Sequence, residues 1–234
     1  MKKPRGVLFD LGDTVLHVGT VDWIPADRKL LSYAENETGI TPEELQEAAN
    51  ILNREFEQAR ISSMIEQDII CFYRRLFDTV GINLTISYEE AAQLCWDMAF
   101  SQELEEGFAD VLDTLDKHGI KAGILSNTVF FGSQIEGEME KQGLGGRFSC
   151  IISSADYGVR KPHPRIFDIA ARKIGLEPCD IWFAGDKPKF DVKGAINAGM
   201  YPVWYNKLNL PSDHGYDCLE IKDWHEFIDI MESL

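Results

Sequence analysis

The sequence contains little cysteine, and none of it falls in a recognisable pair. Five cysteines are scattered singly over 234 residues, with no C-x-x-C spacing. This arrangement supports neither a zinc ribbon nor a disulfide framework. Unpaired thiols of this kind are typical of a reducing compartment. The five positions are Cys71, Cys95, Cys150, Cys179 and Cys218.

Long apolar runs are also missing. No stretch approaches the roughly 18 apolar residues that a membrane-spanning helix needs. The basic start at residues 1–5 is followed by only three apolar residues before Asp10. That is too short for the apolar region of a signal peptide. Together with the unpaired thiols, these absences predict a cytoplasmic protein with no membrane partner.

Basic residues are scarce relative to acidic ones. The chain has 23 Lys and Arg against 39 Asp and Glu, a formal net charge of -16. Such a field repels polyanions, so nucleic acid is not expected as a partner. An anionic substrate would need local cations that overcome this field. With 44% hydrophobic residues, the chain can bury one sizeable core, or one core plus a smaller lobe. The composition does not indicate an oligomeric state.

Short apolar clusters with strand character alternate with helical patterns along much of the chain. Residues 108–118 carry apolar side chains on one helical face, and a second helical pattern begins after residue 163. Alternation of this kind predicts a Rossmann-like α/β fold, with a parallel sheet and helices on both faces. A short strand and a helix are expected over residues 218–234. The other predicted strands are 6–10, 121–127, 150–154, 181–186 and 201–205.

Residues 21–101 break this alternation, because they show helical periodicity without a convincing buried strand. Three capping-box patterns, in which a hydroxyl is followed three residues later by Glu, begin at Thr41, Ser63 and Ser87. We therefore expect an all-helical insert, roughly a four-helix bundle, joined to the sheet by two chain crossings. Closure of one lobe on the other would place a site between them. The predicted domains are an α/β core of residues 1–16 and 105–234, and a helical lobe of residues 17–104.

The insert itself offers no motif for a substrate. Its aromatic residues fall in helical segments, and they are expected to fill the core of the lobe. Three of its arginines, Arg60, Arg74 and Arg75, are expected at its surface. The sequence therefore predicts that the insert determines substrate specificity, but it does not indicate the substrate.

The most informative motif lies at the end of the first predicted strand. Residues 7–14 read VLFDLGDT, so an apolar strand ends on the carboxylate of Asp10 and continues into a tight loop. Open α/β folds place their chemistry at the carboxyl ends of their strands. Asp10 is therefore the first candidate nucleophile. Gly12 follows two residues later, and a second carboxylate, Asp13, comes directly after it.

Three later strands also end in polar side chains. Ser126 and Asn127 end the second strand, where a hydroxyl and free backbone N–H groups are suited to bind a phosphoryl oxygen. Lys161 follows the third strand in a loop stiffened by prolines. Asp186 and Asp191 follow the fourth, and carboxylates so placed suit magnesium. Each residue alone has an ordinary structural explanation, such as a cap or a loop charge. Their occurrence at successive strand ends favours one shared site.

In order and position, these motifs resemble those of the haloacid dehalogenase superfamily, in particular its phosphatase-like branch. The helical insert resembles what that superfamily calls a cap of the first type. In similar phosphatases the first motif reads Asp-x-Asp-Gly-Thr, whereas here the second carboxylate and the glycine have traded places. Gly12 therefore stands at the usual acid/base position. The resemblance covers the whole chain, with the specific motifs in residues 1–16 and 105–206.

The resemblance implies a magnesium-dependent hydrolase that acts on a small phosphorylated metabolite. Asp10 would attack phosphorus and form an aspartyl-phosphate, which water then hydrolyses. Ser126, with Asn127 beside it, would bind the phosphoryl group, and Lys161 would offset negative charge on that group and on the nucleophile. The implied magnesium ligands are Asp10, the backbone carbonyl of Gly12 and Asp186, with Asp191 either a ligand or a residue that orients one.

The exchanged positions leave three interpretations open. In the first, Asp13 reaches the site and protonates the leaving group. In the second, Asp13 caps the loop, and the enzyme either is slow or uses esters whose leaving group needs little protonation. In the third, the protein binds a ligand or regulates without turnover. The 2-haloacid dehalogenases are a further rival. Similar dehalogenases carry an aromatic residue in place of Gly12 and a fourth motif rich in Ser and Asn, whereas Asp186 here favours magnesium.

Overall fold

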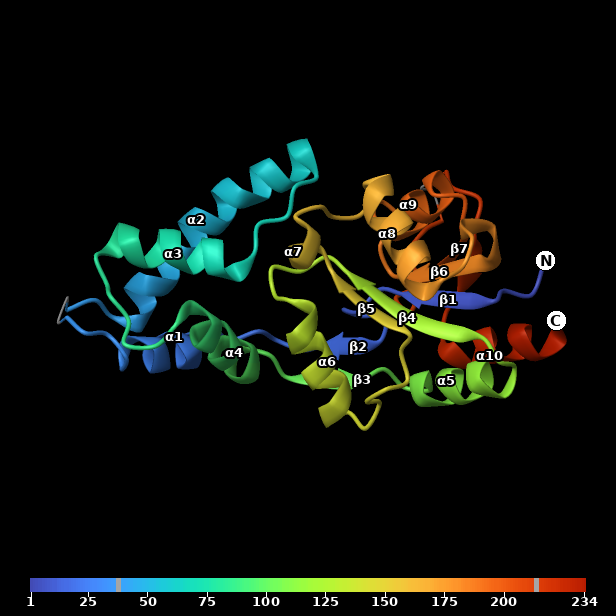
Figure 1. The fold of residues 1–234 in the computed structure, drawn as a ribbon, viewed down its shortest axis with the longest axis horizontal. Coiled ribbons are helices and arrows are strands. Elements are labelled where there is room, and N and C mark those ends of the chain that lie inside the picture. Colours follow the sequence, from blue (N-terminus) through green and yellow to red (C-terminus); the bar gives the residue numbers. More distant parts are fainter. Residues whose placement is uncertain (37–38, 213–214) are drawn as a thin grey trace.

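Six parallel strands form the central sheet of the protein (Figure 1). The computed structural model describes residues 1–36, 39–212 and 215–234. The strand order is β5-β4-β1-β6-β7-β8, and all neighbouring strands run parallel. The predicted α/β fold is confirmed, including the short strand expected near the C-terminus. The strands are β1 (Gly6–Phe9), β4 (Lys121–Ser126), β5 (Cys150–Ser153), β6 (Ile181–Gly185), β7 (Tyr201–Tyr205) and β8 (Leu219–Ile221).

Strand β1 lies where the order of the sheet reverses. From β1 the chain moves outward to β4 and β5, and it then returns past β1 to form β6, β7 and β8. In open α/β sheets, ligands bind beyond the carboxyl ends of the strands at such a reversal. The loops that follow β1, β4 and β6 therefore meet where a site is expected.

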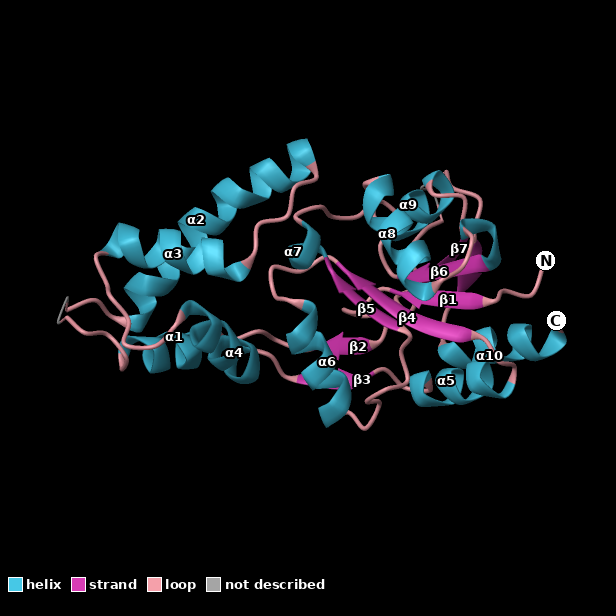
Figure 2. Cartoon of the chain, in the orientation of Figure 1, coloured by secondary structure: helices cyan, strands magenta, loops and turns pink. Residues whose placement is uncertain are grey.

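Alternate side chains of β1 face two different layers of helices. Val7 and Phe9 belong to a buried cluster with α5, α6 and α10, whereas Leu8 belongs to the cluster with α8 and α9. The Phe9 ring lies edge-on to Phe108 and Trp224, with centroids 5.0 and 5.6 Å away. Figure 2 shows these helices on both sides of the sheet, as predicted. Their bounds are α5 (Phe108–Lys117), α6 (Gly132–Lys141), α8 (Pro164–Ile174), α9 (Asp191–Asn197) and α10 (Trp224–Ser233).

Helices α1 to α4 gather at the end of the molecule opposite the two termini, and we call them the helical lobe (Figure 1). Two of the predicted capping boxes are confirmed. Thr41 accepts a hydrogen bond from the backbone of Glu44, whose carboxylate accepts one in return, and Ser87 caps α4 in the same way. The helices are α1 (Ile24–Leu31), α2 (Pro42–Ser63), α3 (Ile69–Val80) and α4 (Tyr88–Ala99).

The third predicted capping box, at Ser63, is wrong. Helix α2 continues through Ser63, whose hydroxyl donates to the carbonyl of Ala59. The helix ends where Met64 adopts a left-handed conformation with φ of 55°. Helix α3 begins later, capped by the Asp68 side chain, which accepts from the backbone N–H of Cys71. The Glu of this pattern, Glu66, lies in the loop between α2 and α3 instead.

The two chain crossings between the lobe and the sheet pair with each other. β2 (Leu16–Val18) and β3 (Gln102–Leu104) form a short antiparallel ribbon, which sequence patterns did not indicate. The division into a helical lobe and an α/β core stays a prediction. No helix in the described part of the chain combines the length and apolar composition needed to cross a bilayer.

Candidate active site

A cavity of about 280 Å³ lies at the carboxyl ends of β1 and β4. Asp10, from the loop after β1, lines it together with Ser126, the last residue of β4. The helical lobe contributes two aromatic side chains, Trp96 and Phe100. The cavity therefore lies between the sheet edge and the lobe, where sequence analysis places the site.

The ammonium of Lys161 lies between two carboxylates of this cavity. Its Nζ is 2.6 Å from Oδ1 of Asp10 and 2.8 Å from Oδ1 of Asp191. Only 2% of the Lys161 side chain is exposed. Burial alone would lower the pKa of Lys161, but the charges of Asp10 and Asp191 outweigh that effect and raise the pKa above its ordinary value. The ammonium therefore stays charged beside the candidate nucleophile.

Asn127 holds the backbone of Lys161 in place. Its side-chain amide donates to the carbonyl of Lys161 at 3.0 Å, and its side-chain oxygen accepts from the N–H of Lys161 at 2.8 Å. Asn127 also lines the cavity, as expected for a substrate-binding residue. These two bonds link the end of β4 to the loop after β5, so two of the predicted strand-end motifs are joined directly.

Asp10, Asp186 and Asp191 each offer a carboxylate oxygen within 4.8 Å of the others. Burial, and next the charge of Asp10, raise the pKa of Asp186 to about 7, although Lys187 at 3.0 Å opposes this. Such crowding of carboxylates is unfavourable unless cations lie among them. Lys161 and Lys187 supply part of that positive charge, and a bound metal would supply more.

The backbone of Lys187 holds the side chain of Asp191, the first residue of α9. Its Oδ2 accepts from the backbone N–H of Lys187 at 2.9 Å. Its buried Oδ1 has no hydrogen-bond partner among the described residues, although it is ion-paired with Lys161. A side chain at Gly185 would place Cβ 2.4 Å from the Asp191 carboxyl carbon, so only glycine permits this approach. Three carboxylates grouped in this way fit magnesium.

The structure brings together most of the residues that the sequence singled out. Asp13 and Asp186 do not line the main cavity, although the Asp186 carboxylate joins the site through its cluster with Asp10 and Asp191. Asp13 lies in a tight turn with φ of 55°. Its carboxylate accepts from the backbone N–H of Val18 at 3.2 Å and lines a neighbouring cavity with His17 and Glu105. About half of the Asp13 side chain is exposed. Of the predicted site residues, those that line the main cavity are Asp10, Gly12, Ser126, Asn127, Lys161 and Asp191.

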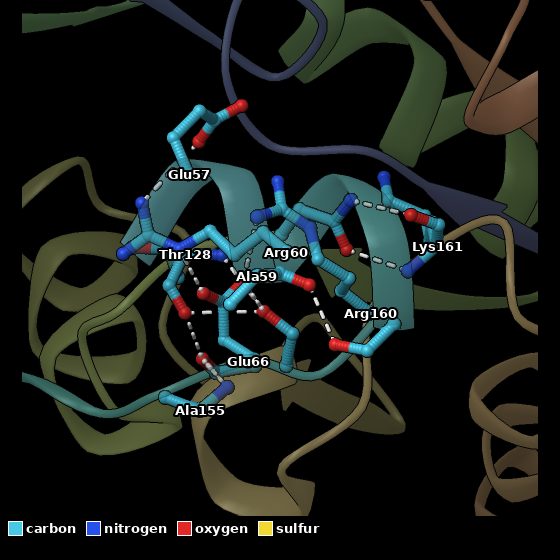
Figure 3. Close-up of polar contacts among 12 residues, drawn as sticks. Glu57, Ala59, Arg60, Glu66, Thr128, Ala155, Arg160 and Lys161 are labelled. Carbon is cyan, nitrogen blue, oxygen red and sulfur yellow. Dashed lines mark hydrogen bonds and ion pairs between the residues drawn. The ribbon is translucent and has the colours of Figure 1, made fainter. Parts of the chain in front are cut away.

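Sequence analysis missed Glu66 and Arg160, and it wrongly placed Arg60 at the surface. The Glu66 carboxylate is buried, and it accepts from Arg60 Nε and from the Ser154 hydroxyl, each at 2.9 Å (Figure 3). Arg160 Nη1 lies 3.5 Å from the same carboxylate, and Arg160 lines the main cavity. Ser154 begins the short helix α7 (Ser154–Tyr157). Of these three residues, only Arg160 had a local signal in the sequence, because it directly precedes the predicted site residue Lys161.

Proteins similar to this chain include two named phosphatases and one named dehalogenase. A Thermus thermophilus phosphoserine phosphatase is 38% identical over 71 residues, 30% of this chain and 28% of that protein, so the match covers under a third of that relative. A glyceraldehyde 3-phosphate phosphatase of Methanocaldococcus jannaschii is 23% identical over 98% of both chains. The solved structure of a 2-haloacid dehalogenase from Pseudomonas syringae has a TM-score of 0.68 and 22% identity over 98% of this chain and 99% of that one. That last likeness shows the fold alone.

The sequence pattern of a known family matches most of the chain. It is described as haloacid dehalogenase-like hydrolase, and it covers residues 4–199. That range contains every residue of the carboxylate cluster and of the main cavity. The resemblance drawn from the strand-end motifs is thereby confirmed, and the chain belongs to the haloacid dehalogenase-like hydrolase family.

Proposed function

We propose that the protein is a magnesium-dependent phosphatase of small phosphate monoesters, with Asp10 as its nucleophile. One observation carries the proposal. The Asp10 carboxylate faces a cavity while Lys161 binds one of its oxygens at 2.6 Å and the Asp186 and Asp191 carboxylates lie within 4.8 Å. A nucleophile, a fixed cation and oxygen ligands for a metal thus meet at one point.

Two further observations support a small phosphorylated substrate. A cavity of about 280 Å³ is at the lower end of the range for ligand sites. Relatives of the chain are named as phosphatases of glyceraldehyde 3-phosphate and of phosphoserine. The helical lobe would act as a cap, since Trp96 and Phe100 from residues 17–104 close one side of the cavity.

In the proposed reaction, an oxygen of Asp10 attacks phosphorus as the bond from phosphorus to the ester oxygen breaks. Lys161 holds the Asp10 carboxylate in place and offsets the charge that gathers on the phosphoryl oxygens. Ser126 donates its hydroxyl to one of those oxygens. Water then attacks the aspartyl-phosphate, inorganic phosphate leaves, and Asp10 is regenerated. Because Gly12 carries no acid and Asp13 lines another cavity, the leaving oxygen takes its proton from water.

Magnesium would be held by Asp10, Asp186 and the backbone carbonyl of Gly12. Asp191 either joins these ligands or orients them. When bound, the ion supplies positive charge to the phosphoryl oxygens. The short distances between the three carboxylates support this assignment. The same cluster favours phosphatase over dehalogenase chemistry, which needs no such group of carboxylates around its nucleophile.

Release of phosphate from p-nitrophenyl phosphate in the presence of magnesium tests the proposal. The parent protein is expected to turn over, and Asp10→Asn is expected to lose activity by at least about a thousandfold, because the amide is a poor nucleophile. Asp168→Asn is a matched control on the exposed side of α8 and should keep the parent rate. A parent that releases no phosphate from a broad set of monoesters would instead favour a binding or regulatory protein. Release of chloride from 2-chloropropionate would favour a dehalogenase.

A further inference from the structure

Three basic side chains line the main cavity, and two of them are paired with the carboxylate cluster. Lys161 is shared between Asp10 and Asp191. Lys187 lies 3.0 Å from Asp186, in the carboxylate cluster. These charges are therefore largely offset before any substrate arrives. The third basic side chain belongs to Arg160.

Arg160 is paired differently. Among the described residues its guanidinium has one ion pair, with Glu66 at 3.5 Å, and Glu66 lies outside the carboxylate cluster. The buried Glu66 carboxylate is also ion-paired with Arg60, whose Nε donates to it at 2.9 Å. One carboxylate thus faces two guanidinium groups, so it cannot offset both. The exposed Glu57, 3.4 Å from Arg60, is a weak additional partner.

The backbone around Arg160 is fixed to the helical lobe. Val159 and Ile65 form an antiparallel bridge between the loop after α7 and the loop after α2. The N–H of Arg160 donates to the carbonyl of Met64 at 3.1 Å, and the N–H of Glu66 donates to the carbonyl of Gly158 at 3.2 Å. Figure 3 shows Arg160 beside Lys161. The Arg160 side chain lines the same cavity as Lys161, with 16% of it exposed.

We propose that Arg160 binds a carboxylate on the leaving group of the substrate, so that the preferred substrates are short phosphate monoesters of hydroxy acids. A planar guanidinium can donate two parallel hydrogen bonds to a carboxylate. Lys161 and Arg160 line the same cavity, so a substrate that contacts both must place its phosphoryl group and its carboxylate few atoms apart. The small cavity sets the same limit. This inference rests on the proposed phosphatase function.

The test compares binding of two esters that differ in one group. Phosphoglycolate carries a carboxylate, and 2-hydroxyethyl phosphate carries a neutral alcohol in its place. Dissociation constants are measured by calorimetry with magnesium, using the Asp10→Asn protein so that neither ester is consumed. We expect phosphoglycolate to bind roughly 10- to 100-fold more tightly, the difference typical of a hydrogen-bonded charge pair.

Three further substitutions, each made in the Asp10→Asn protein, test whether Arg160 causes the preference for phosphoglycolate. Arg160→Gln should remove it while leaving the affinity for 2-hydroxyethyl phosphate within about threefold. Arg160→Lys should keep part of it, because the charge remains without the planar group. Arg172→Gln removes one exposed positive charge from α8 and should keep all of it.

Equal affinity for the two esters, no binding of either, or an Arg160→Gln variant that weakens both alike would overturn the inference. Because none of these measurements needs turnover, they separate this inference from the proposed function. Failure of the proposed function would be seen instead as absence of phosphate release by the parent protein.

Discussion

Lys161 and Asp10 lie 151 residues apart in the sequence, yet Lys161 Nζ donates a hydrogen bond of 2.6 Å to Asp10 Oδ1. Both residues line the main cavity. Both side chains are almost fully buried. A buried ion pair adds little net stability, because the loss of water around two charges cancels much of their attraction. The pair is therefore better explained by the proposed chemistry, since it orients a carboxylate toward the cavity.

Replacing Lys161 by methionine should abolish turnover and destabilise the protein. Asp10 and Asp191 would then face each other without the ammonium between them. Loss of one partner of a buried pair costs about 3–5 kcal/mol, which lowers Tm by roughly 10 °C in a chain of this size. Added magnesium should recover more Tm in Lys161→Met than in the parent, because the cation would offset the same carboxylates. Thermal denaturation with and without magnesium measures both effects.

Lys173→Met, on the exposed side of α8, is the matched control and should leave Tm within about 2 °C of the parent. An unchanged Tm for Lys161→Met would contradict the pairing of Lys161 with the two carboxylates.

Sequence patterns predicted this pair because parallel strands deliver their carboxyl ends to one edge of a sheet. Asp10, Ser126 and Lys161 each lie at or after the end of a recognisable strand. Once the strands were predicted, the positions of these residues at the edge of the sheet followed. The orientation of Asp13 could not be read in the same way. It depends on a left-handed backbone conformation with φ of 55°, which points the carboxylate to the neighbouring cavity.

Glu66 was missed for a different reason. Its local sequence, Ser-x-x-Glu from Ser63, matches a capping box, and a local pattern carries no information on distant partners. The partner that defines its position, Ser154, is 88 residues away. The Arg160 side chain is likewise defined by a contact between the lobe and the sheet. Such contacts are set by packing of whole elements and not by the neighbours of each residue.

Glu66→Gln should be strongly destabilising despite the similar shape of the two side chains. The amide cannot offset the buried Arg60 guanidinium, which would lose its main partner. We expect a loss of about 3–5 kcal/mol in the free energy of unfolding, measured by urea denaturation at pH 7. Glu57→Gln removes the other carboxylate near Arg60, and because Glu57 is 52% exposed it should cost less than about 1 kcal/mol. Similar costs for the two variants would contradict the buried role of Glu66.

Asp27 should make the stability of the helical lobe depend on pH. It is buried in α1, its Oδ2 has no hydrogen-bond partner among the described residues, and burial raises its pKa to about 7. Between its ordinary pKa near 4 and this raised value, the folded state holds a proton that the unfolded state has lost. The contribution of Asp27 to stability therefore falls as pH rises through this range.

Asp27→Asn has no proton to lose, so its stability relative to the parent should rise from pH 5 to pH 8. Urea unfolding of both proteins at these two pH values measures the change. Asp78→Asn, at an exposed position of α3, should show no such trend. A difference between Asp27→Asn and the parent that stays constant with pH would mean that Asp27 has an ordinary pKa.

Gly12→Asp tests what the exchanged motif does to the reaction. A Cβ at Gly12 would meet only the Val18 side chain, at 3.4 Å, so the substitution is expected to be accommodated. The new carboxyl group would line the cavity that Asp13 does not reach. If protonation of the leaving group limits turnover, the rate of 2-hydroxyethyl phosphate hydrolysis should rise by ~10²-fold or more. General acid catalysis typically contributes a factor of ~10² to 10⁴. Hydrolysis of p-nitrophenyl phosphate should rise less, because its leaving group needs little protonation.

Gly12→Asn is the matched control, because it adds a side chain of the same size that cannot donate a carboxylic proton. Its rates on both esters should stay at or below those of the parent protein. The ratio of alkyl to aryl ester hydrolysis is the decisive measurement, since a change in folding or in metal affinity would move both rates together. If Gly12→Asp and Gly12→Asn alter this ratio equally, the missing acid does not limit the parent enzyme, and another step sets its rate.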